Sequence, residues 1–289
     1  MIFVITLNWN RCEDTLEFLA SCSQLAEADT RFLIVDNGST DGSPQEIAKR
    51  YPKVEQIIND RNLGFAAGMN VGIRYALAQG TDWVFLANND TRLAADALTI
   101  LVEAASKTDA ALAAPAIFYA SDPQRIWSAG GWRSRLTLEI RGNRCGQPGD
   151  VLGDEPFEVD FVTACGMLLC RDCLETVGLF DERFFMYYED SDYCLRARRA
   201  GHRAIIVPRA HMWHKVAVSS GGDNSPGERY LMALSSVLFF KKNIRGWRWL
   251  IVAPFRTASA LRTSIRLVMT GRRQAMQSYW RGLRDGLRR

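Results

Sequence analysis

Four short apolar segments divide the first part of the chain, and each runs directly into polar residues. They cover residues 2–7, 32–35, 54–58 and 83–87, and helix-forming stretches follow the first three. Apolar runs of this length between turn-forming residues are typical of buried strands in a parallel sheet. The alternation of strand and helix therefore predicts an α/β fold of the nucleotide-binding type, with a mostly parallel, Rossmann-like central sheet flanked by helices.

The fourth segment ends in Asn88-Asn89-Asp90, which we expect at the carboxyl end of a central strand, where open α/β sheets bind their ligands. A carboxylate there can hold a divalent cation that phosphate oxygens also coordinate, although such a triplet is more commonly a turn or a helix cap. The chain has no Gly-x-Gly-x-x-Gly after its first strand and no Walker A lysine motif. Bound phosphates would therefore lack a glycine cradle, which favours a metal at Asp90.

The chain changes character over residues 118–160, where Gly, Pro, Arg and Trp become frequent and helical periodicity is lost. We expect loops and short hairpins there, a strand at 161–169, and a helix over 189–200. That helix begins with Glu189-Asp190-Ser191-Asp192. Acids in a first turn stabilise the helix dipole, but the aromatic residues before them indicate partial burial. Burial raises carboxylate pKa values and makes a base useful near neutral pH, so both interpretations stay open.

A last strand is predicted at 204–208, followed by His211-Met212-Trp213-His214. A histidine in such a place is usually a packing or capping residue, but one of this pair could supply an imidazole to a metal held by Asp90. The polar segment 221–224 is typical of a lid loop. Two Ser-Pro-x-Glu sequences, at 43–46 and 225–228, predict helix starts with capping boxes.

The cysteines are seven in number and scattered, which suits a reducing compartment better than a disulfide framework. Cys170 and Cys173 form a Cys-x-x-Cys pair near Cys165, but no second pair at zinc-finger spacing accompanies them, so we interpret them as structural thiols. No secretion signal is visible, and no apolar run approaches the roughly 20 residues that a bilayer span needs. These features predict a cytoplasmic protein.

The basic residues are concentrated at the C-terminal end. Residues 241–289 carry thirteen Lys or Arg and one acid, a net charge of +12, whereas the first 240 residues carry 23 basic and 31 acidic residues, a net charge of −8. Apolar and arginine faces on probable helices are typical of an element that lies on a membrane surface. A helical hairpin that packs on the main domain or on a partner subunit is the alternative. Nucleic acid is disfavoured, because no recognised binding motif accompanies the basic run.

Eight short motifs, in order over roughly residues 1–215, together resemble the inverting glycosyltransferase family 2, which has the GT-A fold, and in particular its rhamnosyltransferases. They are Thr6-Leu7-Asn8-Trp9-Asn10, Val35–Gly42 (VDNGSTDG), Arg61–Asn70 (RNLGFAAGMN), Leu86–Asp90 (LANND), Gly166-Met167-Leu168, Gly178–Phe185 (GLFDERFF), Tyr188–Arg196 (YEDSDYCLR) and His214.

The resemblance implies a role for each matching residue. Nucleotide binding would fall to residues at the strand ends: Thr6, Asn8, Asp36, Arg61, Asn62, Asn88 and Asn89. Asp90, with His214, would bind a Mn²⁺ or Mg²⁺ ion that bridges the diphosphate of the donor. Asn88 stands where many members carry a first acid, so metal affinity would depend more on Asp90 and His214. The metal would stabilise the departing nucleoside diphosphate.

On the acceptor side, the resemblance makes Asp190 the general base and suggests that Glu189 binds sugar or acceptor hydroxyls. Trp127, Trp132 and Trp213 are candidate stacking surfaces for sugar rings, although tryptophan is as often part of a core. The implied organisation is a nucleotide-sugar half over 1–115, an acceptor and catalytic half over 116–245, and a basic helical tail over 246–289.

The function expected from these features is the transfer of a sugar from a nucleotide sugar to a lipid-linked or polysaccharide acceptor in cell-surface glycan synthesis. The likeness to rhamnosyltransferases favours L-rhamnose from dTDP-rhamnose, and UDP- and GDP-sugars remain open. We expect the tail to contact the anionic inner face of the cell membrane, and a homodimer is possible. The alternatives are a nucleotidyltransferase that makes sugar nucleotides and a non-catalytic sugar-nucleotide-binding scaffold.

Overall fold

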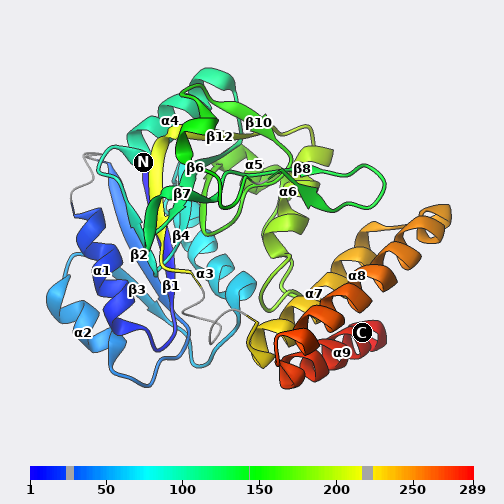
Figure 1. The fold of residues 1–289 in the computed structure, drawn as a ribbon. Coiled ribbons are helices and arrows are strands. Elements are labelled where there is room, and N and C mark those ends of the chain that lie inside the picture. The colour runs from blue at the N-terminus through cyan, green and yellow to red at the C-terminus, as the bar shows by residue number, and fades with distance from the viewer. Residues whose placement is uncertain (24–28, 143, 217–223) are drawn as a thin grey trace.

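A ten-stranded mixed sheet forms the centre of the protein in a computed structural model, which describes residues 1–23, 29–142, 144–216 and 224–289 (Figure 1). Its main path runs β10-β12-β6-β11-β4-β1-β2-β3, with β5 paired to β12 and β7 paired to β6. The two ends of this path correspond to the two halves of the chain. The expected α/β architecture with a mostly parallel central sheet is confirmed.

The N-terminal half of the sheet is parallel throughout. It contains β1 (Ile2–Asn8), β2 (Thr30–Asp36), β3 (Glu55–Ile58) and β4 (Trp83–Asn88). Alternate residues of β1 face opposite sides of the sheet. Phe3 and Ile5 pack with α3 (Phe65–Ala78), and Val4 packs with α1 (Cys12–Cys22) and α2 (Ser43–Arg50). The register pairs Asn8 with Asp36 and brings the polar ends of the strands to one edge.

The second half of the sheet is mixed. Its strands and helices are β5 (Thr91–Leu93), α4 (Ala97–Thr108), β6 (Leu112–Tyr119), β7 (Asp122–Ser128), β10 (Phe157–Val159), β11 (Gly166–Cys170), α5 (Arg171–Val177), α6 (Glu189–Arg199) and β12 (Ala204–His214). A short hairpin of β8 (Trp132–Arg133) and β9 (Ile140–Arg141) and a 3₁₀ turn, η1 (Gly149–Leu152), lie outside it. β11 runs antiparallel to both β4 and β6.

Three local expectations were wrong. The strand expected at 161–169 begins only at Gly166. The last strand does not end at Pro208 but continues to His214, with a register shift between Val207 and His211, because proline has no N–H for the ladder. Both histidines therefore lie within the strand rather than beyond it.

The third concerns the first of the two predicted capping boxes. Ser43 already lies inside α2, after Gly42 in the left-handed region (φ 82°), and its backbone N–H and hydroxyl donate to Asp41 Oδ1. At the second, the Ser225 hydroxyl accepts from the Glu228 N–H at 3.1 Å, as expected. The predicted lid at 221–224 falls largely on residues outside those that the structure describes.

The C-terminal helices form a separate layer at the lower right of Figure 1: α7 (Pro226–Asn243), a 3₁₀ turn η2 (Gly246–Arg248), α8 (Trp249–Met269) and α9 (Arg273–Arg288). α9 packs closely along α7, where a Cβ atom at Gly282 would collide with the Tyr230 carbonyl oxygen. The Tyr230 hydroxyl donates to Asp285 at 3.2 Å. Among the residues that the structure describes, no helix is both long and apolar enough to span a bilayer.

Candidate active site

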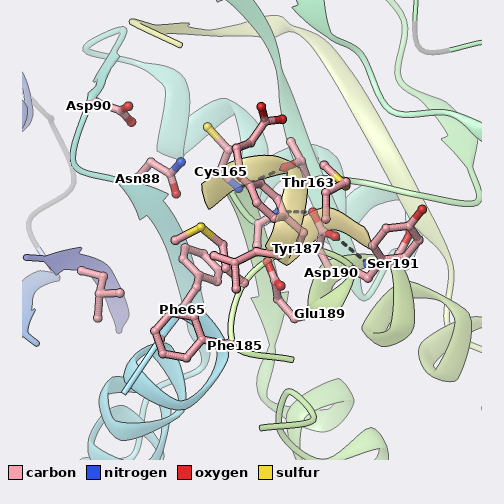
Figure 2. A pocket seen from close by; sticks show the side chains of 18 of the residues that line it. Phe65, Asn88, Asp90, Thr163, Cys165, Phe185, Tyr187, Glu189, Asp190 and Ser191 are labelled. Carbon is pink, nitrogen blue, oxygen red and sulfur yellow. Dashed lines mark hydrogen bonds between the residues drawn. The ribbon is translucent and has the colours of Figure 1, made fainter. Parts of the chain in front are cut away.

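One cleft of about 1100 Å³ lies at the carboxyl ends of β1 and β4. The wall that faces these strand ends is formed by the segment before α6, by the β8–β9 hairpin and by α7. The predicted site residues that line it are Asn62, Asn88, Asn89, Asp90, Trp127, Glu189, Asp190 and His214. Figure 2 shows Asp90 and Asn88 on one side of this cleft and Glu189 and Asp190 on the other. The two carboxylates singled out by the sequence, Asp90 and Asp190, thus share one cavity.

A buried hydrogen-bond network beside the cleft joins α1 to the ends of three strands. The Asn8 amide donates to Asp36 Oδ2 at 2.7 Å, and the Thr15 hydroxyl of α1 donates to Asn8 Oδ1 at 2.8 Å. Asn89 Nδ2 in turn donates to the same Thr15 hydroxyl at 2.9 Å. These links hold the ends of β1, β2 and β4 in fixed relative positions, because each buried polar group would be costly to leave unpaired.

The other four predicted nucleotide-binding residues do not line the cleft. Thr6, Asn8 and Asp36 are fully buried, Arg61 is exposed, and none of the four is among the described residues that line the cleft. Asp36 Oδ1 accepts from the Ser39 N–H at 2.7 Å. In this structure Asp36 therefore binds neighbouring protein groups on both carboxylate oxygens.

Asp90 and His214 come together through strand pairing. β5 pairs with the end of β12 so that Thr91, the residue after Asp90, lies opposite His214. Asp90 Oδ1 lies 3.2 Å from His214 Nε2, and both side chains are buried. Burial disfavours the charged imidazole, but the Cys165 sulfur and the Asp90 carboxylate together raise the pKa of His214 above its usual range.

These two side chains fit a divalent cation. Asp90 Oδ1 and His214 Nδ1 are buried and make no hydrogen bond of normal geometry to the described part of the chain. A carboxylate oxygen and an imidazole nitrogen are both ligands that Mn²⁺ accepts. The described residues contain no cluster of three or more His, Cys, Asp or Glu side chains that could hold a metal alone. A cation here would therefore complete its shell with water or phosphate oxygens.

Asp190 lies at the first turn of α6, where backbone N–H groups point toward it. Its Oδ1 accepts from the Ser191 N–H at 2.7 Å and its Oδ2 from the Ala164 N–H at 3.4 Å. Burial raises the pKa of Asp190 above its usual value, and these hydrogen bonds act in the opposite direction. The result is a carboxylate that is fixed in direction and has increased basicity, as a general base requires.

Glu189 is buried beside Asp190, and its Oε2 has no hydrogen-bond partner among the described residues. Burial, and next the charge of Asp190, raise the pKa of Glu189 well above its usual value. The residues before it, Tyr187 and Tyr188, both have φ near 70°, which is uncommon for non-glycine residues. Such backbone strain is often found at functional sites.

Arg133 is a cation behind this pair that the sequence did not indicate. It is buried, and its guanidinium donates to the Ser191 carbonyl at 2.9 Å and to the Leu138 carbonyl at 3.0 Å. Burial lowers the pKa of Arg133, while Cys194, Asp190 and other neighbours raise it. Its charge in turn lowers the pKa of Asp190. Arg133 therefore couples the β8–β9 hairpin to the start of α6.

The chain is similar to known proteins over most of its length. The profile of Glycosyl transferase family 2 matches residues 3–170, more than half of the chain. The chain belongs to glycosyl transferase family 2. The protein is therefore a glycosyltransferase, and membership of this family argues against both the nucleotidyltransferase and the non-catalytic scaffold.

Two curated relatives of this glycosyltransferase are rhamnosyltransferases. The N-acetylglucosaminyl-diphospho-decaprenol L-rhamnosyltransferase of Mycobacterium tuberculosis is 31% identical over 285 residues, covering 86% of this chain and 89% of the relative. The dTDP-rhamnosyl transferase RfbF of Shigella flexneri is 27% identical over 236 residues, covering 78% and 75%. The chain is thus rhamnosyltransferase-like within its family.

Solved structures support the GT-A fold. The mannosyltransferase PcManGT from Pyrobaculum calidifontis, in complex with GDP-Man and Mn²⁺, superposes with a TM-score of 0.59 at 17% identity over 97% of this chain and 73% of that one. GalNAc-T7 with UDP, GalNAc and Mn²⁺ gives a TM-score of 0.61 at 13% identity over 83% and 49%. At these identities the likeness concerns the fold.

The glycosyltransferase site also includes an apolar wall that the sequence did not reveal. Its residues come from three separate elements: Leu138 and Ile140 of the hairpin, Phe185 and Met186 before α6, and Leu231, Met232 and Phe240 of α7. The capping box at Ser225 fixed the start of α7, but no pattern indicated which face of that helix meets the cleft.

The three tryptophans proposed as stacking surfaces lie in different places. Trp127 lines the cleft and packs edge-on against His214, with ring centroids 4.3 Å apart. Trp132 is exposed on the hairpin, and Trp213 lies under the Arg92 guanidinium at 4.9 Å. Neither of these two is among the described residues that line the cleft.

Proposed function

We propose that the protein transfers L-rhamnose from dTDP-rhamnose to a hydroxyl of a lipid-linked acceptor, with inversion at the anomeric carbon. The observation that carries the proposal is the single cleft that holds Asp90 and Asp190 on opposing walls. The donor and acceptor follow from the two curated relatives, whose names specify a diphospho-decaprenol acceptor and a dTDP-rhamnosyl donor.

In this mechanism the oxygen of the acceptor hydroxyl bonds to the anomeric carbon, and Asp190 removes the proton of that hydroxyl as the bond forms. The bond from that carbon to the diphosphate oxygen breaks at the same time, and the nucleoside diphosphate leaves with the electron pair. Glu189, whose raised pKa favours the protonated form, can donate a hydrogen bond to a sugar oxygen. Asn62, Asn88 and Asn89 offer amide groups to the donor along the opposite wall.

Asp90 and His214 would hold a Mn²⁺ or Mg²⁺ ion, and both structural neighbours described above were solved with Mn²⁺. When bound, the ion would neutralise the charge that develops on the leaving diphosphate. We further propose that residues 1–115 form the donor half, that 116–245 form the acceptor half, and that the tail over 246–289 contacts the inner face of the cell membrane.

The test replaces Asp190 by Asn, which keeps the size of the side chain and one of its two acceptor oxygens but cannot accept the proton. Transfer should fall by about 10²- to 10⁴-fold, while the shift in melting temperature caused by dTDP-rhamnose with Mn²⁺ stays unchanged. Asp150→Asn, on the exposed η1 turn, is the control. Equal loss of donor binding and turnover in Asp190→Asn would remove Asp190 from the role of base.

A further inference from the structure

The outward face of α8 is an apolar stripe that no described part of the chain covers. Leu250, Leu261, Ile265 and Val268 are 45 to 79% exposed. At 3.6 residues per turn, these four side chains fall within an arc of about 60° on one side of the helix. Val252, Ala260 and Leu267 lie on the opposite side and are buried. α8 is thus apolar both toward the body of the protein and away from it.

The charges around this stripe are of one sign. Arg262 and Arg266 are exposed and lie about 60° and 100° around the helix from the edge of the stripe at Ile265, and their long side chains can extend toward that edge. No Asp or Glu occurs between Glu228 and Asp285. A helix with a leucine- and isoleucine-rich face edged by arginines matches an anionic lipid surface, where the apolar side chains enter the acyl region and the guanidinium groups meet phosphates. Two copies of this face would bring like charges together.

The N-terminal end of the stripe lies beside the cleft. The Arg248 guanidinium donates to the carbonyls of Arg135 and Leu136 at 2.7 and 3.0 Å, which joins the start of α8 to the tip of the β8–β9 hairpin. Trp247 and Leu136 are exposed at this junction. Beneath it, Val252 belongs to the same apolar cluster as Leu138 and Phe240, which both line the cleft.

We propose that the face formed by Leu250, Leu261, Ile265 and Val268, with Arg262 and Arg266 at its edge, docks on an anionic bilayer. Trp247 and Leu136 extend this docking face toward the cleft. A lipid-linked acceptor then presents its sugar to Asp190 while most of its lipid stays in the bilayer. The apolar wall of α7 and the hairpin contacts the part of the lipid nearest its diphosphate. This last consequence rests on the rhamnosyl transfer proposed above. The docking face refines the membrane contact proposed there for the tail and does not depend on the transfer reaction.

The experiment measures co-sedimentation of the full chain with vesicles of phosphatidylcholine alone or with about one third phosphatidylglycerol. Leu261→Glu combined with Ile265→Glu should weaken binding to the anionic vesicles by at least about tenfold. The matched control is Ile58→Glu with Val151→Glu, two exposed apolar residues outside the C-terminal helices, at 60% and 46% exposure. This control should bind like the unchanged protein, and melting temperatures establish that both variants fold.

A second variant separates charge from apolar contact. Arg262→Gln with Arg266→Gln should weaken binding to anionic vesicles by roughly 25-fold, since each arginine near such a surface contributes about fivefold. Binding to phosphatidylcholine vesicles should change little. Added salt should weaken binding of the unchanged protein more than that of this variant, because salt screens the two arginine charges that the variant lacks.

Transfer to a short-chain acceptor in solution distinguishes this inference from the proposed function. The Leu261→Glu, Ile265→Glu protein should keep that activity and lose transfer only to acceptor embedded in vesicles. Failure of every protein to transfer rhamnose would count against the proposed function and leave vesicle binding as the test of the face. The docking face would be overturned if the Leu261→Glu, Ile265→Glu protein bound vesicles as well as its Ile58→Glu, Val151→Glu control. It would also be overturned if the unchanged protein formed a concentration-dependent dimer that the Leu261→Glu, Ile265→Glu substitutions abolish.

Discussion

The two walls of the cleft are built by different means. The wall proposed to bind the donor, here the donor wall, lies at the ends of β1, β2 and β4 and is fixed by buried side-chain hydrogen bonds that pass from Asp36 through Asn8 and Thr15 to Asn89. The wall proposed to bind the acceptor, here the acceptor wall, is formed by packed apolar side chains of α7 and the hairpin, and the strained segment at Tyr187 and Tyr188 leads from it to Glu189 and Asp190. A rigid polar frame suits a nucleotide with fixed hydrogen-bonding groups, whereas an apolar wall suits a lipid-bearing acceptor.

Removal of Asp90, the carboxylate proposed to bind the metal, should have the largest effect on this contrast. Asp90→Ala should lower transfer by at least about 100-fold, because a group that stabilises charge on the leaving diphosphate is lost. Titration of Mn²⁺ against the transfer rate would check it, with the exposed Asp96→Ala as control. If Asp90→Ala responds to Mn²⁺ like the unchanged protein, the donor wall does not hold its metal at Asp90.

The next test concerns the place where the two walls touch. Gly64 has φ 84°, and a Cβ atom there would meet the Phe185 carbonyl oxygen at 2.5 Å and the Phe185 ring at 2.7 Å. The neighbouring Phe65 N–H donates to the same carbonyl at 2.6 Å. Gly64→Ala combines backbone strain with overpacking and should lower the free energy of unfolding by about 2–4 kcal/mol, as measured in urea.

Gly178→Ala is the matched control for this substitution. Gly178 has a similar φ of 81°, but a Cβ atom there would have open space around it. Only the backbone strain remains, so the loss should be smaller than that of Gly64→Ala, about 1–2 kcal/mol. Similar losses at the two glycines would mean that the contact between the walls contributes little to stability.

The sequence predicted the donor wall better than the acceptor wall, and the difference has a physical cause. Polar residues after an apolar run mark the end of a buried strand, and the ends of parallel strands meet at one edge, so Asn88, Asn89 and Asp90 could be located from local pattern alone. Leu138 and Leu231 reach the cleft only through long-range packing of the hairpin and α7, which leaves no periodic signal near them.

The same reasoning explains the partial result for Thr6, Asn8 and Asp36. The pattern placed them at the correct edge of the sheet, but the hydrogen-bond partners of Asn8 and Asp36, such as Thr15 and Ser39, come from segments whose relative position the sequence does not specify. His214 shows the opposite case. Its strand was predicted too short, yet its proximity to Asp90 follows from the pairing of β5 with β12.

The buried cation behind the acceptor wall should affect the pH dependence of the rate. Arg133 lowers the pKa of Asp190, whose burial acts in the opposite direction. Arg133→Met should therefore raise that pKa further, and the acidic limb of the kcat profile should move to higher pH because Asp190 must be ionised to accept a proton. The rate at pH 6 should fall several-fold more than the rate at pH 9.

Arg133→Lys distinguishes this electrostatic role from a structural one. Lysine keeps the positive charge but lacks the fork that reaches both the Ser191 and Leu138 carbonyls. The position of its acidic limb should resemble that of the unchanged protein. A uniform loss of rate at every pH in Arg133→Met would assign the residue to packing of the hairpin alone.

The smallest effects provide the most direct test of the contrast between the walls. Thr15→Val removes the hydroxyl that links Asn8 to Asn89 on the donor wall. Ser235→Ala removes the hydroxyl of α7 that donates to the Met186 carbonyl at 2.8 Å on the acceptor wall. Each change removes hydrogen bonds of the type that contribute about 0.5–1.5 kcal/mol. Thr15→Val should raise KM for the donor by about three- to tenfold and leave KM for the acceptor unchanged, and Ser235→Ala should do the reverse.

Both hydroxyls are buried and neither lines the cleft, so a general loss of stability would change KM for the donor and KM for the acceptor together in both variants. The crossed pattern arises only if each wall positions its own substrate, and initial rates measured against both substrates would reveal it.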